Sequence, residues 1–100
     1  MGGYIVEAEI VFILRQAILI AVRDAYGPTT LERALRHSEL FGAEPEAVLR
    51  EWRELEKHGY LEPLPGSSGK YLRLTEKGAA QAEYRPGAAD PFIHGVKAMG

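Results

Sequence analysis

Apolar residues dominate the first quarter of the chain, and the polar residues among them recur every seven or eight positions. These polar residues are Glu7, Arg15, Gln16, Arg23 and Asp24. On an α-helix they fall on one narrow stripe, and the rest of the circumference is apolar. The pattern therefore predicts one long helix over residues 7–26, with more apolar surface than a small domain can cover.

This excess apolar surface requires a second partner. We expect the partner to be the same helix of a second copy, packed about a twofold axis to form a homodimer. The expected interface residues are Ile10, Phe12, Ile13, Leu14 and Ile18. The alternative is that residues 4–8 form an extra strand of a sheet and that the helix starts later.

Turn and capping signals follow the first helix, which Gly27-Pro28 ends. Thr29-Thr30-Leu31-Glu32 has the pattern of a capping box, in which a threonine hydroxyl accepts from the backbone three residues on and Glu32 reaches back. A second helix is predicted to about His37. Leu40 and Phe41 are expected to anchor the next turn in the core.

A third helix is predicted from Pro45, a residue suited to the first helical position because that position needs no backbone donor. Val48, Trp52 and Leu55 are four and three apart and share one face, so Trp52 is expected to pack in the core. Gly59 ends the helix, because glycine adopts the left-handed conformation at no cost.

The next segment predicts a β-hairpin. Residues 60–64 and 70–74 have strand character, and the tip Pro65-Gly66-Ser67-Ser68-Gly69 is rich in turn-forming residues. Thr75 is expected to cap a last short helix over residues 76–83.

This order of helix, glycine stop, strand, turn, strand and helix resembles the winged helix-turn-helix superfamily, in the manner of MarR-like and PadR-like transcriptional regulators. The resemblance covers residues 15–80. It is carried by Val48, Trp52, Leu55, Gly59, Tyr60 and Leu61, and then by Leu72-Arg73-Leu74-Thr75-Glu76-Lys77-Gly78. It implies an α+β fold, a three-helix core with a two- or three-stranded wing, over residues 1–84. Residues 85–100 then form a loose C-terminal tail.

The resemblance also implies a DNA-binding transcriptional regulator, because in such proteins the third helix enters the major groove and the wing contacts the backbone or the minor groove. By position, Arg50, Arg53 and Lys57 would read DNA, since their three-then-four spacing puts them on one face. Arginine can pair with both acceptors of guanine. The wing residues expected to meet phosphates are Ser67, Ser68, Lys70 and Arg73.

The charge balance leaves a second interpretation open. The formal net charge is −2 and the pI is about 5.9, whereas dedicated DNA binders are more often basic. From Glu44 to Lys77, six Lys and Arg stand against seven Glu, a net charge of −1. Glu46 near the helix start would repel a phosphate, and Leu49 is apolar. The alternative function is a winged-helix protein-interaction module that contacts its partner through Leu49 and binds no DNA.

The composition argues against most other site chemistry. One hundred residues make one domain, and without cysteine there is no disulfide and no thiolate metal site. His37, His58 and His94 are scattered and lack partners at metal-ligand spacing. No nucleophilic triad or carboxylate pair stands out. We therefore expect no enzyme activity, no cofactor and no metal.

The location expected from the sequence is the cytoplasm, since no signal peptide is visible and cysteine is absent. The apolar run over residues 5–22 is about long enough to span a bilayer, but Glu7, Glu9 and Arg15 lie inside it. No membrane span is therefore expected. In the tail, the apolar residues of segment 90–96 are expected to pack on the domain or on a dimer mate. The alternative is a docking peptide.

Overall fold

The computed structural model describes residues 2–84, with side chains from residue 9 onward. These residues form four α-helices, one 3-10 helix and a two-stranded antiparallel sheet. The elements are α1 (Gly2–Asp24), α2 (Leu31–Ala34), η1 (Ser38–Leu40), α3 (Pro45–Lys57), β1 (Leu61–Pro63), β2 (Leu72–Leu74) and α4 (Glu76–Ala82). The predicted α+β class is confirmed, and the arrangement is compatible with a winged helix. The tail and its segment 90–96 lie outside the described residues.

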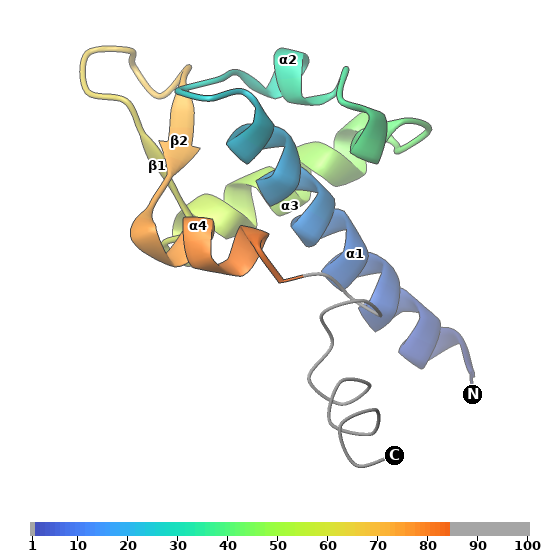
Figure 1. Ribbon diagram of the computed structural model, residues 1–100. Coiled ribbons are helices and arrows are strands. Elements are labelled where there is room, and N and C mark those ends of the chain that lie inside the picture. Colours follow the sequence, from blue (N-terminus) through green and yellow to red (C-terminus); the bar gives the residue numbers. More distant parts are fainter. Residues whose placement is uncertain (1, 85–100) are drawn as a thin grey trace.

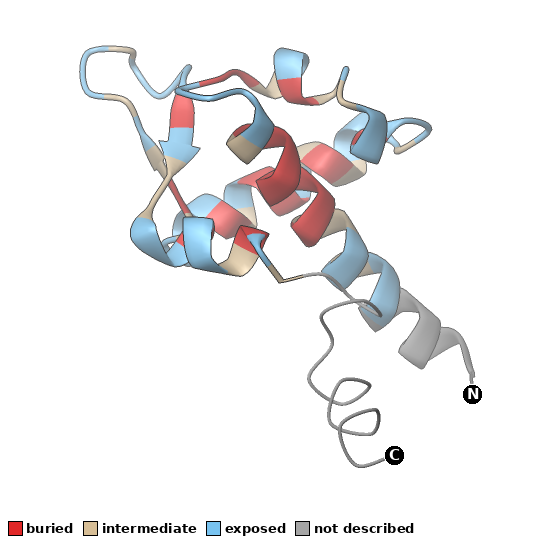
Figure 2. Ribbon diagram, in the orientation of Figure 1, coloured by how far each residue is buried: buried red, intermediate tan, exposed pale blue. Residues whose placement is uncertain are grey.

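Helix α1 is the centre of the fold, and it packs against α3, α4, η1 and β2. In Figure 1 it crosses in front of α3 and projects away from the other elements toward its N-terminus. It begins at Gly2, so the alternative that residues 4–8 form a strand is wrong. Figure 2 shows a run of buried residues in the C-terminal half of α1, with exposed residues at the end of the helix and toward its N-terminus. Within the described part of the chain, no helix combines the length and the apolar character needed to cross a bilayer.

Two residues of the polar stripe of α1, Arg15 and Gln16, contact the body of the protein. Arg15 donates to the carboxylate of Glu51 on α3 at 2.6 Å. Gln16 is only 3% exposed, and its amide nitrogen donates to the carbonyls of Gln81 and Tyr84 at the end of α4. The amide nitrogen of Gln81 donates back to Gln16 Oε1 at 2.9 Å. Among the described residues, every buried side-chain polar atom has a hydrogen-bond partner. These hydrogen bonds fix how α1 packs on α3 and α4.

Helix α3 is anchored by the face that the sequence predicted. Val48, Trp52 and Leu55 are 0%, 6% and 2% exposed and lie in one core cluster with Ile18 and Leu19 of α1. Burial of apolar side chains is the main favourable term in folding. The opposite face of α3 is therefore held outward.

The junction between α1 and α2 differs from the predicted capping box. Thr30 is the N-cap and its hydroxyl accepts from the N–H of Arg33 at 3.2 Å. The third helical position is thus Arg33, so Glu32 does not stand where a capping box needs it. Helix α2 ends at Ala34 rather than near His37.

Thr29 forms a β-bridge with Leu72 and is not the N-cap of α2. Its N–H donates to the Leu72 carbonyl at 2.8 Å, and the Leu72 N–H donates to the Thr29 carbonyl at 2.9 Å. This isolated bridge lies on the side of β2 away from β1. The sheet therefore has two strands and a single bridging residue as its third member.

The hairpin of β1 and β2 is shorter than predicted, with three residues in each strand. Leu61 pairs with Leu74, Glu62 with Arg73 and Pro63 with Leu72. Gly66 and Gly69 in the connecting turn have φ of +85° and +78°. Glycine adopts these left-handed angles without a steric penalty.

The base of the hairpin is tied to α3 and α4 around Thr75. The Thr75 hydroxyl accepts from the Gly78 N–H at 3.0 Å, as predicted for a cap, and donates to the Gly59 carbonyl at 2.6 Å. Its N–H donates to the Tyr60 carbonyl at 3.1 Å. Lys77 donates to the His58 carbonyl at 2.9 Å. These hydrogen bonds therefore hold the end of α3, the start of β1 and the start of α4 together.

The turn before α3 corrects one expectation. Leu40 is 2% exposed and lies in the core as predicted, but Phe41 is 91% exposed. The 3-10 helix directs Leu40 inward, and the chain leaves it in an extended conformation at Phe41. Phe41 is therefore a surface residue rather than a core anchor.

Candidate nucleic-acid interface

The outward face of α3 carries the three basic residues that the spacing predicted. Arg50, Arg53 and Lys57 are all exposed, on the side opposite the buried Val48 and Trp52. At 3.6 residues per turn they lie within a narrow sector of the helix. The structure thus brings together the three α3 positions selected from the sequence.

Hydrogen-bonded ion pairs do not hold these cations. The Arg50 side chain is 70% exposed, and its Nε lies 3.7 Å from Glu51 Oε2, which is too long for a hydrogen bond. Across residues 9–84, Arg53 and Lys57 have no ion-pair partner. All three side chains can therefore extend toward a ligand without first breaking a strong contact.

Glu51 is one of the seven Glu in the charge count from the sequence, and the structure buries it. It is 5% exposed and faces the body, where Arg15 supplies its counter-charge at 2.6 Å. Val48, Glu51, Trp52 and Leu55 follow the i, i+3, i+4, i+7 spacing of a buried face, and this spacing could have identified it. Without Glu51, the balance between Glu44 and Lys77 becomes six Lys and Arg against six Glu, a net charge of zero.

The remaining carboxylates of α3 and its cap lie toward both ends of the helix, with Glu44 and Glu46 at the start and Glu54 and the exposed Glu56 in the C-terminal half. Glu44 is the N-cap residue and makes no side-chain capping hydrogen bond, and both Glu44 and Glu46 are exposed. Farther along the helix, Glu54 Oε1 lies 3.3 Å from His58 Nε2. Leu49 is half-buried at the edge of the outward face. Arg50, Arg53 and Lys57 thus occupy the middle and the C-terminal end of α3, where Glu54 and Glu56 also lie.

The hairpin contributes fewer available groups than predicted. Lys70 and Ser68 are exposed, and no other side chain of the described region pairs with Lys70. Arg73 is also exposed, but its Nε donates to Glu62 Oε2 at 2.9 Å. The Ser67 hydroxyl donates to the Leu64 carbonyl at 2.7 Å and accepts from the backbone. Arg73 and Ser67 therefore already form hydrogen bonds within the β1–β2 hairpin.

The predicted dimer residues divide into two groups. Ile10, Phe12 and Ile13 are 55%, 39% and 55% exposed, and Leu14 is half-buried. Ile18 is 0% exposed and packs in the core of its own chain. The prediction is wrong for Ile18, because the body of the protein closes over α1 between Leu14 and that residue.

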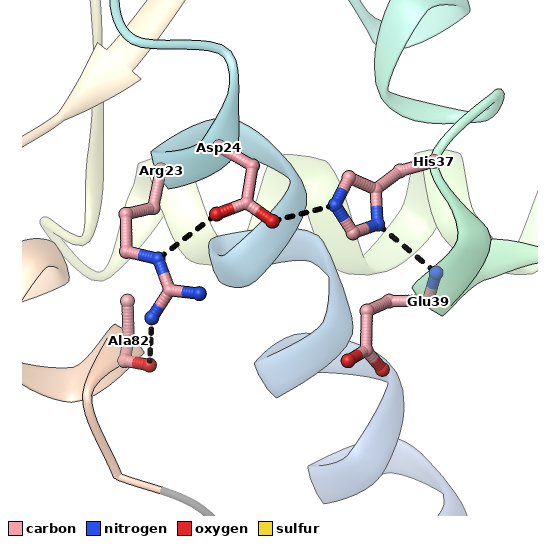
Figure 3. A network of polar contacts seen from close by, with 5 residues as sticks. All are labelled: Arg23, Asp24, His37, Glu39 and Ala82. Atoms are coloured by element: carbon pink, nitrogen blue, oxygen red, sulfur yellow. Dashed lines mark hydrogen bonds and ion pairs between the residues drawn. The ribbon is translucent and has the colours of Figure 1, made fainter.

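A polar network joins the end of α1 to η1 and α4 (Figure 3). His37 Nε2 lies 2.7 Å from Asp24 Oδ2, and His37 Nδ1 accepts from the Glu39 N–H at 3.0 Å. Because Nδ1 is an acceptor, the neutral ring carries its proton on Nε2 and donates it to Asp24. Arg23 donates to Asp24 at 3.1 Å and reaches the Ala82 carbonyl at 3.4 Å.

This network acts on Asp24 electrostatically. The hydrogen bond from His37 holds the pKa of the Asp24 carboxyl below its usual value of 3.8, and Arg23 adds to this effect, while burial opposes it. Hydrogen bonds that favour the charged form lower a carboxyl pKa. Among the described residues, no group of three or more His, Cys, Asp or Glu could hold a metal ion. We assign the network a structural role.

Comparisons of the chain with protein-family models, with curated proteins and with solved structures found no match. The function proposed below therefore rests on the geometry and charge of the described residues.

Proposed function

We propose that this protein is a DNA-binding transcriptional regulator of the winged helix type. The observation that carries the proposal is the outward face of α3, where Arg50, Arg53 and Lys57 are exposed and outside any hydrogen-bonded ion pair. A regulator of this kind must be in the same compartment as the DNA, and we propose that this compartment is the cytoplasm.

The order of elements supports this assignment. Helix α2 and the η1 turn lead into α3, and the hairpin follows directly, with β2 bridged on its other side by Thr29. The 13 residues of α3 make a rod about 20 Å long. The major groove, about 12 Å wide, admits such a helix. We propose that α3 occupies the groove and that the hairpin meets the adjacent backbone.

The cationic side chains would have two different roles, base reading and phosphate contact. Arg50 and Arg53 would read base edges, since the planar guanidinium can donate two hydrogen bonds to guanine. Lys57 and Lys70 would neutralise phosphates, which positions the protein but carries no sequence information. Arg73 would contribute little, because contact with a phosphate requires it to leave Glu62.

The charge distribution sets the expected salt dependence. The two cations assigned to phosphates, Lys57 and Lys70, give a slope of log K against log salt of about −1.8. Glu44 and Glu46 repel phosphates at the start of α3, so affinity should be modest. The orientation of α3 in the groove should keep this end farthest from the backbone.

The test is fluorescence anisotropy of labelled duplex DNA, first of random sequence and then of a selected site, at low and moderate salt. Replacing both Arg50 and Arg53 with alanine should cost roughly 1–3 kcal/mol per lost base contact and relax sequence preference. A matched control replaces Arg33 and Arg36, two exposed arginines outside α3 and the hairpin, and removes the same charge. Equal sequence preference in wild type and the Arg50/Arg53 variant would refute the assignment.

A protein-interaction module is the second candidate function. The half-buried Leu49 and the exposed Glu44 and Glu46 form a mixed apolar and acidic surface that suits a basic protein partner better than DNA. No binding to duplex DNA even at low salt would favour this role. Leu49→Asp should then abolish partner binding and leave the far-UV circular dichroism spectrum unchanged.

A further inference from the structure

An apolar groove of about 390 Å³ runs between the projecting half of α1 and the start of α3. One wall is formed by Ile10, Ile13 and Ala17 of α1, and the other by Phe41, Ala43 and Ala47. Glu39 and Glu44 also line it, and within the described part of the chain no Lys or Arg does. The groove is separate from the cationic face of α3.

Exposure of large apolar side chains is concentrated around this groove. Ile10 and Ile13 are each 55% exposed, and Phe41 is 91% exposed. If a large apolar side chain offers about 200 Å² when fully exposed, these three leave on the order of 400 Å² in contact with water. A patch of this size is as large as the largest apolar patch of a typical monomeric protein, and such patches are often functional.

We infer that α1 of a second copy lies in this groove, so that two copies pair about a twofold axis. Ile10, Ile13, Leu14 and Ala17 follow the i, i+3, i+4, i+7 spacing with which one helix packs against another. The groove and the helix that fits it belong to the same chain, which is the self-complementarity that a twofold interface needs. Ala17, Ala43 and Ala47 are small and leave room for a second helix.

The apolar area at the groove supplies a large part of what a dimer needs. Two copies of the patch together remove about 800 Å² of apolar surface from water, whereas a specific interface should bury at least about 1,000 Å² of polar and apolar surface together. Phe41, outside the interface expected from the sequence, becomes one of its central contacts.

The rim charges predict how the dimer responds to salt. Each copy brings Glu39 and Glu44 to the groove edge, so like charges approach when the copies pair. Salt screens such repulsion. Dimerisation should therefore strengthen as salt rises, whereas DNA binding should weaken, which separates the two processes experimentally.

The second copy would also touch the proposed DNA-reading helix. Glu44 is the N-cap of α3 and Ala47 lies in its first turn, and both line the groove. A helix in the groove would thus restrict the start of α3 and set the separation of the two α3 faces. The inference goes beyond DNA binding and does not depend on it.

Sedimentation velocity of the full chain without DNA tests the inference. The wild type should be dimeric, and Ile13→Asp or Phe41→Ser should raise the dimer Kd at least about tenfold, as for a central interface residue. Tyr26→Ser is the matched control, because Tyr26 is 94% exposed but lies at the far end of α1. Circular dichroism checks that each variant folds.

A second measurement uses the absence of cysteine from the chain. Ile13→Cys should give a disulfide-linked dimer under mild oxidation, since the twofold axis brings the two α1 helices together, and Tyr26→Cys should not. This result would support the interface even if Ile13→Asp failed to fold.

Three outcomes would overturn the inference. The first is a monomeric wild type at about 100 µM, and the second is a dimer that Phe41→Ser leaves unchanged. The third is a dimer that Phe92→Asp disrupts as strongly as Ile13→Asp, because the tail would then be the occupant. The Arg50/Arg53 double alanine variant should remain dimeric, so a failure of DNA binding cannot be mistaken for a failure of pairing.

Discussion

Gly78→Ala sets two opposing effects against each other in α4. Alanine is the better helix former by about 1 kcal/mol, so propensity alone predicts stabilisation. A Cβ at this position would lie 2.0 Å from the Tyr60 carbonyl oxygen and 3.2 Å from Leu74 Cδ2. The first contact is with backbone and cannot be relieved by rotating a side chain. Accommodation therefore requires α4 to move away from the hairpin base by about 1 Å.

The cost of that movement exceeds the gain in propensity. Overpacking a buried site costs roughly 1–3 kcal/mol. The displaced Tyr60 carbonyl also accepts from the Thr75 N–H at 3.1 Å, and losing this hydrogen bond adds about 1 kcal/mol. After subtraction of the propensity gain, we expect Gly78→Ala to destabilise the protein by about 2 kcal/mol. At this chain length the Tm should fall by roughly 8–16 °C.

Urea unfolding followed by the fluorescence of Trp52 measures this effect, because the chain contains one tryptophan and it is 6% exposed. Ala79→Gly, at an exposed position of the same helix, is the matched control. It isolates the propensity term and should cost about 1 kcal/mol. If Gly78→Ala is as stable as the wild type or more stable, the close packing of α4 on Tyr60 is wrong.

Three further outcomes are expected. Arg15→Met should destabilise the protein by about 3 kcal/mol in urea unfolding, because the buried Glu51 then has only Arg50 nearby, whose Nε lies 3.7 Å away, too far for a hydrogen bond; the double change to Arg15→Met and Glu51→Leu should recover much of the loss, and additive costs would contradict the pairing. Asp24→Asn should remove a stabilisation of at most about 0.5 kcal/mol that exists above pH 3.8, because the pKa of Asp24 is lowered in the folded state; the difference from wild type should vanish as the pH falls through that lowered value, and a constant difference would count against it. Lys70→Ala should weaken binding to all DNA sequences alike and reduce the salt slope by about 1, and a sequence-dependent loss would contradict a phosphate contact.

Local signals in the sequence predicted the elements of the body well. The spacing of Val48, Trp52 and Leu55 identified the buried face of α3, and Gly59 and Thr75 marked where helices end and begin. These predictions held because each depends on one helix or on one turn. The physical cause, burial of one face or capping of one end, acts within a few residues.

The contacts between elements could not be predicted in the same way. Periodicity shows that polar residues share a stripe, but not whether the stripe faces water. Arg15 and Gln16 face α3 and α4 because Glu51, Gln81 and the Tyr84 carbonyl satisfy them there, and those partners are 36 to 68 residues away in sequence. The exposure of Phe41 has a similar origin, since it depends on how η1 directs the chain.

Pro63 has a consequence for how copies of this protein can associate. Leu64 donates its N–H to the carbonyl of Tyr71, the residue before β2. In an antiparallel ladder the direction of the backbone hydrogen bonds alternates, so the backbone of Pro63 points to the open side of β1. Proline has no N–H there, and the other side of β2 is occupied by Thr29. Strand-to-strand growth of the sheet into a larger assembly, the usual hazard of an unprotected margin, is therefore blocked on both sides.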